Sequence, residues 1–85
     1  MTNPKHDRLV PLFGITPGSW VKITSLPMDI IGARFIRLGI TPGSKVKCIE
    51  RLPGGTIVIQ KKRQQIAIGH LLAKQIIVCL LGVNE

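Results

Sequence analysis

Apolar and polar residues alternate in two stretches of the chain that begin in a similar way. Val21 and Ile23 alternate with polar neighbours in the first stretch, and Val46 and Cys48 do so in the second. Alternation of this kind is typical of a β-strand with one buried face. We therefore predict a first strand over residues 20–25 and a second strand of the same phase that starts at residue 45.

Three further stretches have the composition of strands. Residues 56–60 and 65–68 are rich in β-branched residues, and a polar tip at residues 61–65 separates them. Residues 75–81 form the closing strand, and residues 69–74 suit a short helical turn before it. About five strands in so short a chain predict a mainly β fold, a small and partly open β-barrel.

A six-residue sequence, Gly-Ile-Thr-Pro-Gly-Ser, occurs twice, at residues 14–19 and 39–44. Thr-Pro-Gly-Ser suits a type II turn, because Pro presets φ and Gly supplies a positive φ at the next position. Each copy precedes one of the two alternating strands. The repeat keeps the inward phase of both strands, which a shared core requires because a one-residue slip would turn every side chain over.

A short helix is predicted between the two copies, within residues 28–39. Asp29 is a suitable N-cap, and Gly39 is suited to the position just after the helix. Ile31, Phe35 and Leu38 have helical spacing, so we expect this stripe to pack the helix on the sheet. Glycine at position 32 should weaken the helix by roughly 1 kcal/mol relative to alanine.

The residue Ile36 stands apart from that stripe. It lies about 140° from the centre of the stripe at about 100° per residue. We expect Ile36 to face solvent or a partner, beside Arg37 and Ala33. A short helix in a barrel corner can also be covered on both sides, in which case Ile36 belongs to the core.

Length and composition predict one domain. The chain has 85 residues, of which 45% are hydrophobic, and we expect a flexible tail over residues 1–12 and a single domain over residues 13–83. The longest apolar run is far shorter than the roughly 20 residues that span a bilayer. The N-terminus has no apolar segment of a secretory signal, so we expect a cytoplasmic protein.

The net charge of +8 indicates an acidic partner, which could be nucleic acid, an anionic membrane surface or an acidic protein face. The chain has two Phe, one Trp and no Tyr, which disfavours stacking on single-stranded nucleic acid but leaves duplex binding through phosphates open. The basic tip Lys61, Lys62 and Arg63 is the candidate contact for such a partner. Lys45, Lys47 and Arg51 are expected to extend this basic patch.

Catalytic and metal sites are not predicted. The residues of metal-binding type follow no ligand spacing; they are His6, His70, Asp29, Glu50, Cys48 and Cys79. The two cysteines sit in apolar stretches and are expected to be buried free thiols. The chain has no catalytic triad, no paired carboxylates and no glycine loop before a helix, so we do not expect an enzyme or a bound cofactor.

Residues 34–46, Arg-Phe-Ile-Arg-Leu-Gly-Ile-Thr-Pro-Gly-Ser-Lys-Val, resemble the signature R-L-x-x-L-G-(L/M/I)-x-P-G-x-x-V of the FeoA-type domain. Residues 20–24 look like the first strand of that family, and residues 66–78 look like its ending. The resemblance covers about residues 14–80. The chain departs from the family pattern at Phe35, where Leu is usual, in the shorter loop at residues 53–56, and at Gly69, where a basic residue is frequent.

The resemblance implies an SH3-like barrel with one short helix after the first strand. It implies a non-catalytic, cytosolic accessory protein that binds and modulates the membrane ferrous iron transporter of bacteria, whose B component carries a cytosolic GTPase domain. Such a protein would be peripheral to the inner membrane through the transporter. We expect the partner to contact Ile36, Arg37, Lys61, Lys62 and Arg63.

Two alternatives remain open at this point. A small basic barrel could bind nucleic acid or a transcriptional regulator, although the scarcity of aromatic residues disfavours nucleic acid. The exposed strand edges of an open barrel could also pair and give a weak homo-oligomer.

Overall fold

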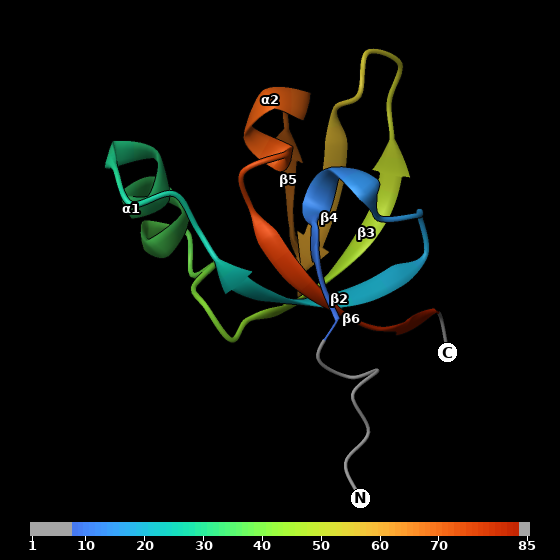
Figure 1. The fold of residues 1–85 in the computed structure, drawn as a ribbon, viewed down its shortest axis with the longest axis horizontal. Helices are drawn as coiled ribbons and strands as arrows, with labels where there is room; N and C mark the ends of the chain where they lie inside the picture. Colours follow the sequence, from blue (N-terminus) through green and yellow to red (C-terminus); the bar gives the residue numbers. More distant parts are fainter. Residues whose placement is uncertain (1–7, 84–85) are drawn as a thin grey trace, which may run out of the picture.

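The computed structural model describes residues 8–83 and shows one strongly curled antiparallel sheet (Figure 1). The sheet has six strands in the order β1-β6-β2-β3-β4-β5. The strands are β1 Leu9–Pro11, β2 Ser19–Ser25, β3 Lys45–Arg51, β4 Ile57–Lys61, β5 Gln64–Ile68 and β6 Ile77–Val83. The helical segments are η2 Leu12–Gly14, α1 Ile30–Arg37 and α2 His70–Ala73. The fold is therefore mainly β, as predicted, with a sixth strand beyond the expected five.

The two six-residue repeats form equivalent turns. Gly18 and Gly43 have φ values of +96° and +98°, the conformation that favours glycine. The amide of Gly18 donates to the carbonyl of Cys48 at 2.7 Å, and the amide of Gly43 donates to the carbonyl of Ile23 at 2.7 Å. Each turn thus closes on the strand that follows the other turn, which gives the centre of the sheet a local two-fold relationship.

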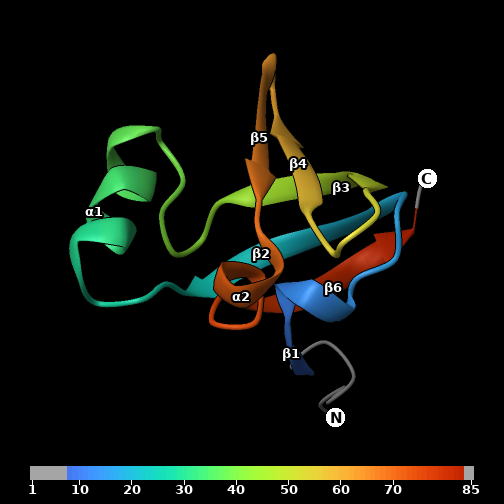
Figure 2. The ribbon, with the colours of Figure 1, turned by 90° about the horizontal axis from the view of Figure 1, so that it is seen from above.

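The predicted phase of the two central strands is confirmed. Val21, Ile23, Val46 and Cys48 are all 1% exposed or less. They pack inside the curl of the sheet with other large apolar side chains that are almost fully buried; these are Leu12, Ile40, Ile57, Ile59, Ile68, Ile76 and Val78. The turn of α2 and the short helix η2 lie at one mouth of the curl (Figure 2).

The start of the domain differs from the prediction of a tail through residue 12. Leu9–Pro11 pairs with β6, with Leu9 opposite Cys79 and Pro11 opposite Ile77. Leu12 is fully buried, and its amide donates to the carbonyl of Ile76 at 2.8 Å. Pro11 is tolerated because β1 is an edge strand, where a missing amide costs no ladder bond. Residues 1–7 of the expected tail lie outside the described residues.

The helix α1 projects from the end of β2 and does not lie on the sheet (Figures 1 and 2). Its predicted packing stripe is wrong in part: Phe35 is buried, but Ile31 and Leu38 are 37% and 43% exposed. The reason is that the segments joining α1 to β2 and β3 place it beyond the end of the sheet, so that one large side chain reaches the core. Phe35 is therefore the anchor of α1.

Glycine at position 32 has a role that the helix propensity does not reveal. A Cβ atom on Gly32 would lie 1.9 Å from the carbonyl oxygen of Pro27. The close approach of this backbone to the helix requires the absence of a side chain. Gly32 is thus part of the joint between α1 and the segment that precedes it, and the expectation that it merely weakens the helix is corrected.

Candidate functional site

The helix α1 is held at both ends by local interactions. Oδ1 of Asp29 accepts hydrogen bonds from the amides of Ile31 at 3.0 Å and Gly32 at 3.3 Å, so Asp29 is the N-cap that the sequence predicts. Gly39 follows the C-terminal turn with a φ of +86°, and its amide donates to the carbonyl of Ile36 at 2.9 Å. A helix of eight residues with one buried large side chain needs such caps, because its own propagation energy is small.

Ile36 lies on the surface of α1, as predicted. Its side chain is 54% exposed, although its neighbour Phe35 is buried. Ile36 lines one wall of a shallow groove of about 400 Å³; the other residues around this groove are Leu26, Pro27, Met28, Asp29, Gly32, Ala33 and Pro42. The lining is mostly apolar, so the groove suits an apolar side chain of a partner.

The basic tip is a two-residue hairpin loop between β4 and β5. Lys61 pairs with Gln64 at the end of the ladder, which leaves Lys62 and Arg63 as the loop. Lys62 has a φ of +57°, a conformation that costs a residue with a side chain about 1 kcal/mol or more. The side chain of Gln60 supports the loop by donating from Nε2 to the carbonyl of Lys62 at 2.8 Å. Both Lys62 and Arg63 are exposed.

Lys61 differs from the other two cations of the tip. It is only half-exposed, and its Nζ donates a hydrogen bond to the carbonyl oxygen of Gly39 at the end of α1. The carbonyls at a helix C-terminus carry partial negative charge, which favours a cation there. Lys61 therefore joins the tip to the helix, whereas Lys62 and Arg63 remain available to a partner.

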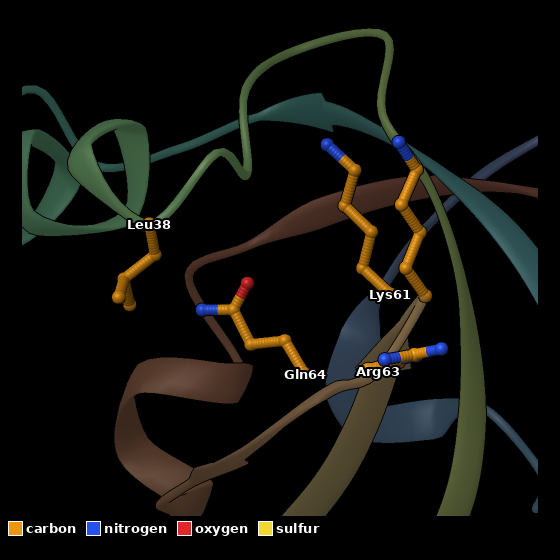
Figure 3. A pocket seen from close by; sticks show the side chains of 5 residues that line it. Leu38, Lys61, Arg63 and Gln64 are labelled. Atoms are coloured by element: carbon orange, nitrogen blue, oxygen red, sulfur yellow. The ribbon is translucent and has the colours of Figure 1, made fainter.

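A pocket of about 440 Å³ lies between the end of α1 and the tip; it is lined by Leu38, Lys61, Lys62, Arg63 and Gln64. Figure 3 shows the side chain of Gln64 extending toward Leu38 at the end of α1. The structure thus brings the basic tip next to the end of α1 through Leu38, whereas Ile36 lines the separate groove described above. Arg37 is exposed in the last turn of α1.

Of the residues on β3 that are expected to extend the basic patch, Lys47 lies next to the tip and Arg51 does not. Lys47 stands opposite Gln60, next to the tip. Arg51 stands opposite Ile57 at the far end of β4, where its guanidinium lies 5.0 Å from the centre of the Phe13 ring and donates to the Phe13 carbonyl. The antiparallel register separates the two ends of β3, so Arg51 does not belong to the patch.

The residues of metal-binding type are dispersed. Among residues 8–83, no group of three or more His, Cys, Asp or Glu side chains comes close enough to hold a metal ion. His70 is exposed beside Phe13, with 6.1 Å between the ring centres. Cys48 and Cys79 are buried and are not joined in a disulfide. Burial raises the pKa of the Cys48 thiol, which keeps it protonated and unreactive. His6 lies outside the described residues.

The sequence interpretation missed one residue of this surface, Leu38. The helical spacing puts Leu38 in the packing stripe of α1, but in the structure it lines the pocket beside the basic tip. A signal was present: Ile30 and Ile31 are adjacent, and with Ile36 and Leu38 they place apolar residues around most of the helix circumference, which one short contact with a core cannot bury.

A comparison with protein families and solved structures gives a consistent result. The model of the FeoA domain matches residues 10–79. A crystal structure of an iron uptake regulatory protein (FeoA) is 28% identical, with a TM-score of 0.75, over 87% of this chain and 100% of that one. The FeoA protein of Chlorobium tepidum is 23% identical, with a TM-score of 0.78, over 89% of this chain and 74% of that one.

Some similar structures belong to larger proteins. A manganese-dependent transcriptional repressor is 21% identical, with a TM-score of 0.74, and the match covers 86% of this chain but 42% of the repressor. At this identity the likeness concerns the fold alone, an SH3-like barrel. No curated protein matches the chain. None of the helices within residues 8–83 is long and apolar enough to cross a membrane. The match over residues 10–79 shows that the chain belongs to the FeoA domain family.

Proposed function

We propose that this protein is a non-catalytic accessory component of a bacterial ferrous iron uptake system. In this role it binds and modulates the membrane transporter that carries a cytosolic GTPase domain. Membership of the FeoA domain family supports the proposal. The similar crystal structure is that of an iron uptake regulatory protein, and another similar structure is that of the iron(II) transport protein A of Clostridium thermocellum.

One structural observation supports a binding role above all: a projecting helix presents Ile36 at the wall of an apolar groove, and a basic tip adjoins its end. Exposed apolar side chains next to a groove supply affinity when a partner covers them. Cations at the rim of an interface increase the rate of association with an acidic surface. The proposed contact residues are Ile36 and Arg37 on α1, with Lys61, Lys62 and Arg63 at the tip.

Modulation follows from binding alone. A protein that binds one conformation of the transporter more tightly than another shifts the equilibrium between them by that difference in affinity. It does not need to contact iron or GTP. Ferrous iron is then the cargo of the transporter, and the work of this chain is done on the cytoplasmic side, at the inner membrane, through the transporter.

The proposal is tested by capture of the transporter from detergent-solubilised membranes by the tagged protein. Ile36→Gln and the pair Lys62→Glu with Arg63→Glu should each reduce recovery several-fold. Lys61 is left in place because it joins the tip to α1. Leu71→Gln is the matched control, since Leu71 is likewise exposed, on α2. Equal recovery by all variants, or recovery by the native protein that does not fall as salt rises, would contradict the proposed surface.

The second candidate function is binding to nucleic acid or to a transcriptional regulator. The net charge of +8 and the fold shared with a manganese-dependent transcriptional repressor favour it. The same capture experiment decides between the two. Recovery of nucleic acid alone, lost steeply as salt rises, would favour this candidate because binding through phosphates releases counterions. A weak homo-oligomer through the edge strands β1 and β5 would appear as a concentration-dependent mass.

A further inference from the structure

Half of the exposed large apolar residues of residues 8–83 lie in one segment of the chain. The structure has ten such residues, and five of them are Met28, Ile30, Ile31, Ile36 and Leu38. Met28 and Ile30 are 99% and 71% exposed. This segment comprises α1 and its two ends, the part that projects from the sheet (Figures 1 and 2). A small protein rarely exposes apolar side chains in such a concentration without a contact for them.

These residues do not all face the same way. Taking about 100° per residue, Ile30, Ile31, Arg34, Arg37 and Leu38 lie within about 120° of one another around α1. We name these five residues the outer face of α1. Ile36 lies on the other side of the helix, with Ala33, in the groove described above. The outer face is thus separate from the groove itself, and Arg37 is the one residue that belongs both to the outer face and to the partner contact proposed on α1.

Apolar and cationic residues are interleaved on the outer face. Arg34 and Arg37 stand between the two isoleucines and Leu38, and Leu38 continues into the pocket with Lys62 and Arg63. Within residues 8–83 none of these four cations forms an ion pair. The only acidic residue of α1 and its ends, Asp29, is engaged as the N-cap. Asp29 lines the groove on the other side of α1, so the outer face itself is apolar and positive.

We propose that the outer face of α1 binds directly to an anionic lipid bilayer, with Ile30 and Ile31 inserted between headgroups. A helix that carries bulky apolar residues between arginines is suited to the interface of a membrane, where the apolar side chains enter the acyl boundary and the cations meet lipid phosphates. The face is presented by a helix that projects from the sheet (Figures 1 and 2). A deformable bilayer accommodates such a shape, whereas the groove on the opposite side of α1 is the concave surface that suits a side chain of a protein.

The inference goes beyond the proposed role at a transporter and can fail independently of it. Insertion of the outer face would leave Ile36 and its groove, on the opposite side of α1, facing away from the bilayer, where the cytosolic part of a membrane protein can reach them. The capture experiment is made in detergent, without a bilayer. The membrane inference is tested on the purified protein with lipid vesicles alone.

The test is cosedimentation of the full chain with vesicles of phosphatidylcholine, with or without about 30% phosphatidylglycerol. Binding is expected only with the anionic lipid, and it should fall as salt rises from about 0.05 M to about 0.5 M. Arg34→Gln with Arg37→Gln removes two cations and should weaken binding about 25-fold, because each cation strengthens binding to an anionic surface about five-fold. Ile30→Ser with Ile31→Ser should weaken it at least ten-fold, since two buried apolar side chains are lost.

Matched controls identify the face. Lys22→Gln with Lys74→Gln removes two exposed cations that belong neither to α1 nor to the basic tip, and should change binding much less than the arginine pair. Leu71→Ser removes an exposed apolar residue from α2. Equal loss in the lysine and arginine pairs would show attraction by net charge alone and overturn the inference. Absence of binding to the anionic vesicles would overturn it as well.

Tryptophan fluorescence gives a second test of insertion, in which a bulky apolar side chain is kept at position 30. In a chain with Trp20→Phe and Ile30→Trp, the single tryptophan lies on the outer face. Its emission should shift to shorter wavelength when anionic vesicles are added, because the indole enters a less polar environment. The same chain with Leu71→Trp in place of Ile30→Trp should show no shift. Unchanged emission of the tryptophan at position 30 during binding would exclude insertion and contradict the inference.

Discussion

The ammonium group of Lys61 donates a hydrogen bond to the carbonyl oxygen of Gly39, a residue 22 positions earlier in the chain. This contact connects the tip of the β4–β5 hairpin with the C-terminal end of α1. The helix otherwise projects from the sheet with Phe35 as its one large buried side chain. The position of α1, and with it the orientation of Ile36 and the outer face, thus depends on a cation that the sequence suggests only as a partner contact.

Replacement of Lys61 by methionine keeps the length of the side chain and removes the donor. We expect Lys61→Met to lower the free energy of unfolding by about 0.5–1 kcal/mol, since a carbonyl at a helix C-terminus loses a charged donor at a partly exposed site. Urea unfolding measures this change. Lys62→Met is the matched control and should have almost no effect, because the Lys62 ammonium has no partner of this kind. Equal effects of the two substitutions would contradict a role of Lys61 in the joint.

Gly32→Ala should destabilise the protein although alanine is the better helix former. The new Cβ would lie 1.9 Å from the Pro27 carbonyl oxygen, so the backbone must move apart. We expect a loss of about 2 kcal/mol or more, against a gain of about 1 kcal/mol in helix propensity. Gly14→Ala is the control, because a Cβ there meets no atom within 4 Å. The melting temperatures of the two variants are compared with that of the native protein. A Gly32→Ala variant more stable than the native protein would show that the backbone at Pro27 can move away from α1 without cost.

The strands, the repeated turns and the caps of α1 could be predicted because each depends on local chemistry. Val21 and Val46 alternate with lysines, Gly18 and Gly43 supply positive φ, and Asp29 precedes a helix. These signals are independent of how the sheet curls. The register of the strands then follows from the phase of the buried residues.

The place of α1 relative to the sheet could not be predicted in the same way. Spacing alone puts Ile31, Phe35 and Leu38 on one side of the helix, but it does not say how much of that side the sheet covers. The close approach of Pro27 to Gly32 and the bond from Lys61 to Gly39 are contacts between distant or differently folded segments. The strand β1 was missed for a related reason, since three residues with a proline carry no periodic signal and pair only because β6 offers an open edge.

Substitution of two adjacent residues of α1 should change the stability of the protein to very different extents. Phe35 is 6% exposed and belongs to the core, so Phe35→Ala should cost about 3 kcal/mol or more. Ile36→Ala should change stability by less than about 0.5 kcal/mol, because its side chain is mostly in solvent already. The midpoints of urea unfolding give both values. A large loss in Ile36→Ala would place Ile36 in the core and remove it from the proposed partner surface.

The buried thiol of Cys48 gives a prediction on pH. Burial raises the pKa of this thiol in the folded protein, whereas in the unfolded chain it takes the ordinary value of about 8.5. The unfolded state therefore loses its proton at lower pH than the folded state does. The resulting contribution to stability is present in full below about pH 8.5 and is lost as the pH rises toward the raised value in the folded state.

The measurement compares the native protein with Cys48→Ala, which lacks the titrating group. The free energy of unfolding of the native protein should fall more steeply than that of the variant between about pH 8.5 and about pH 10. The two proteins share every other titrating group, so the difference between the two curves isolates Cys48. At pH 8 the thiol should react with a disulfide reagent only as fast as the protein opens, because a protonated and buried sulfur is a poor nucleophile. Parallel curves together with rapid labelling would show that Cys48 is accessible in the native state.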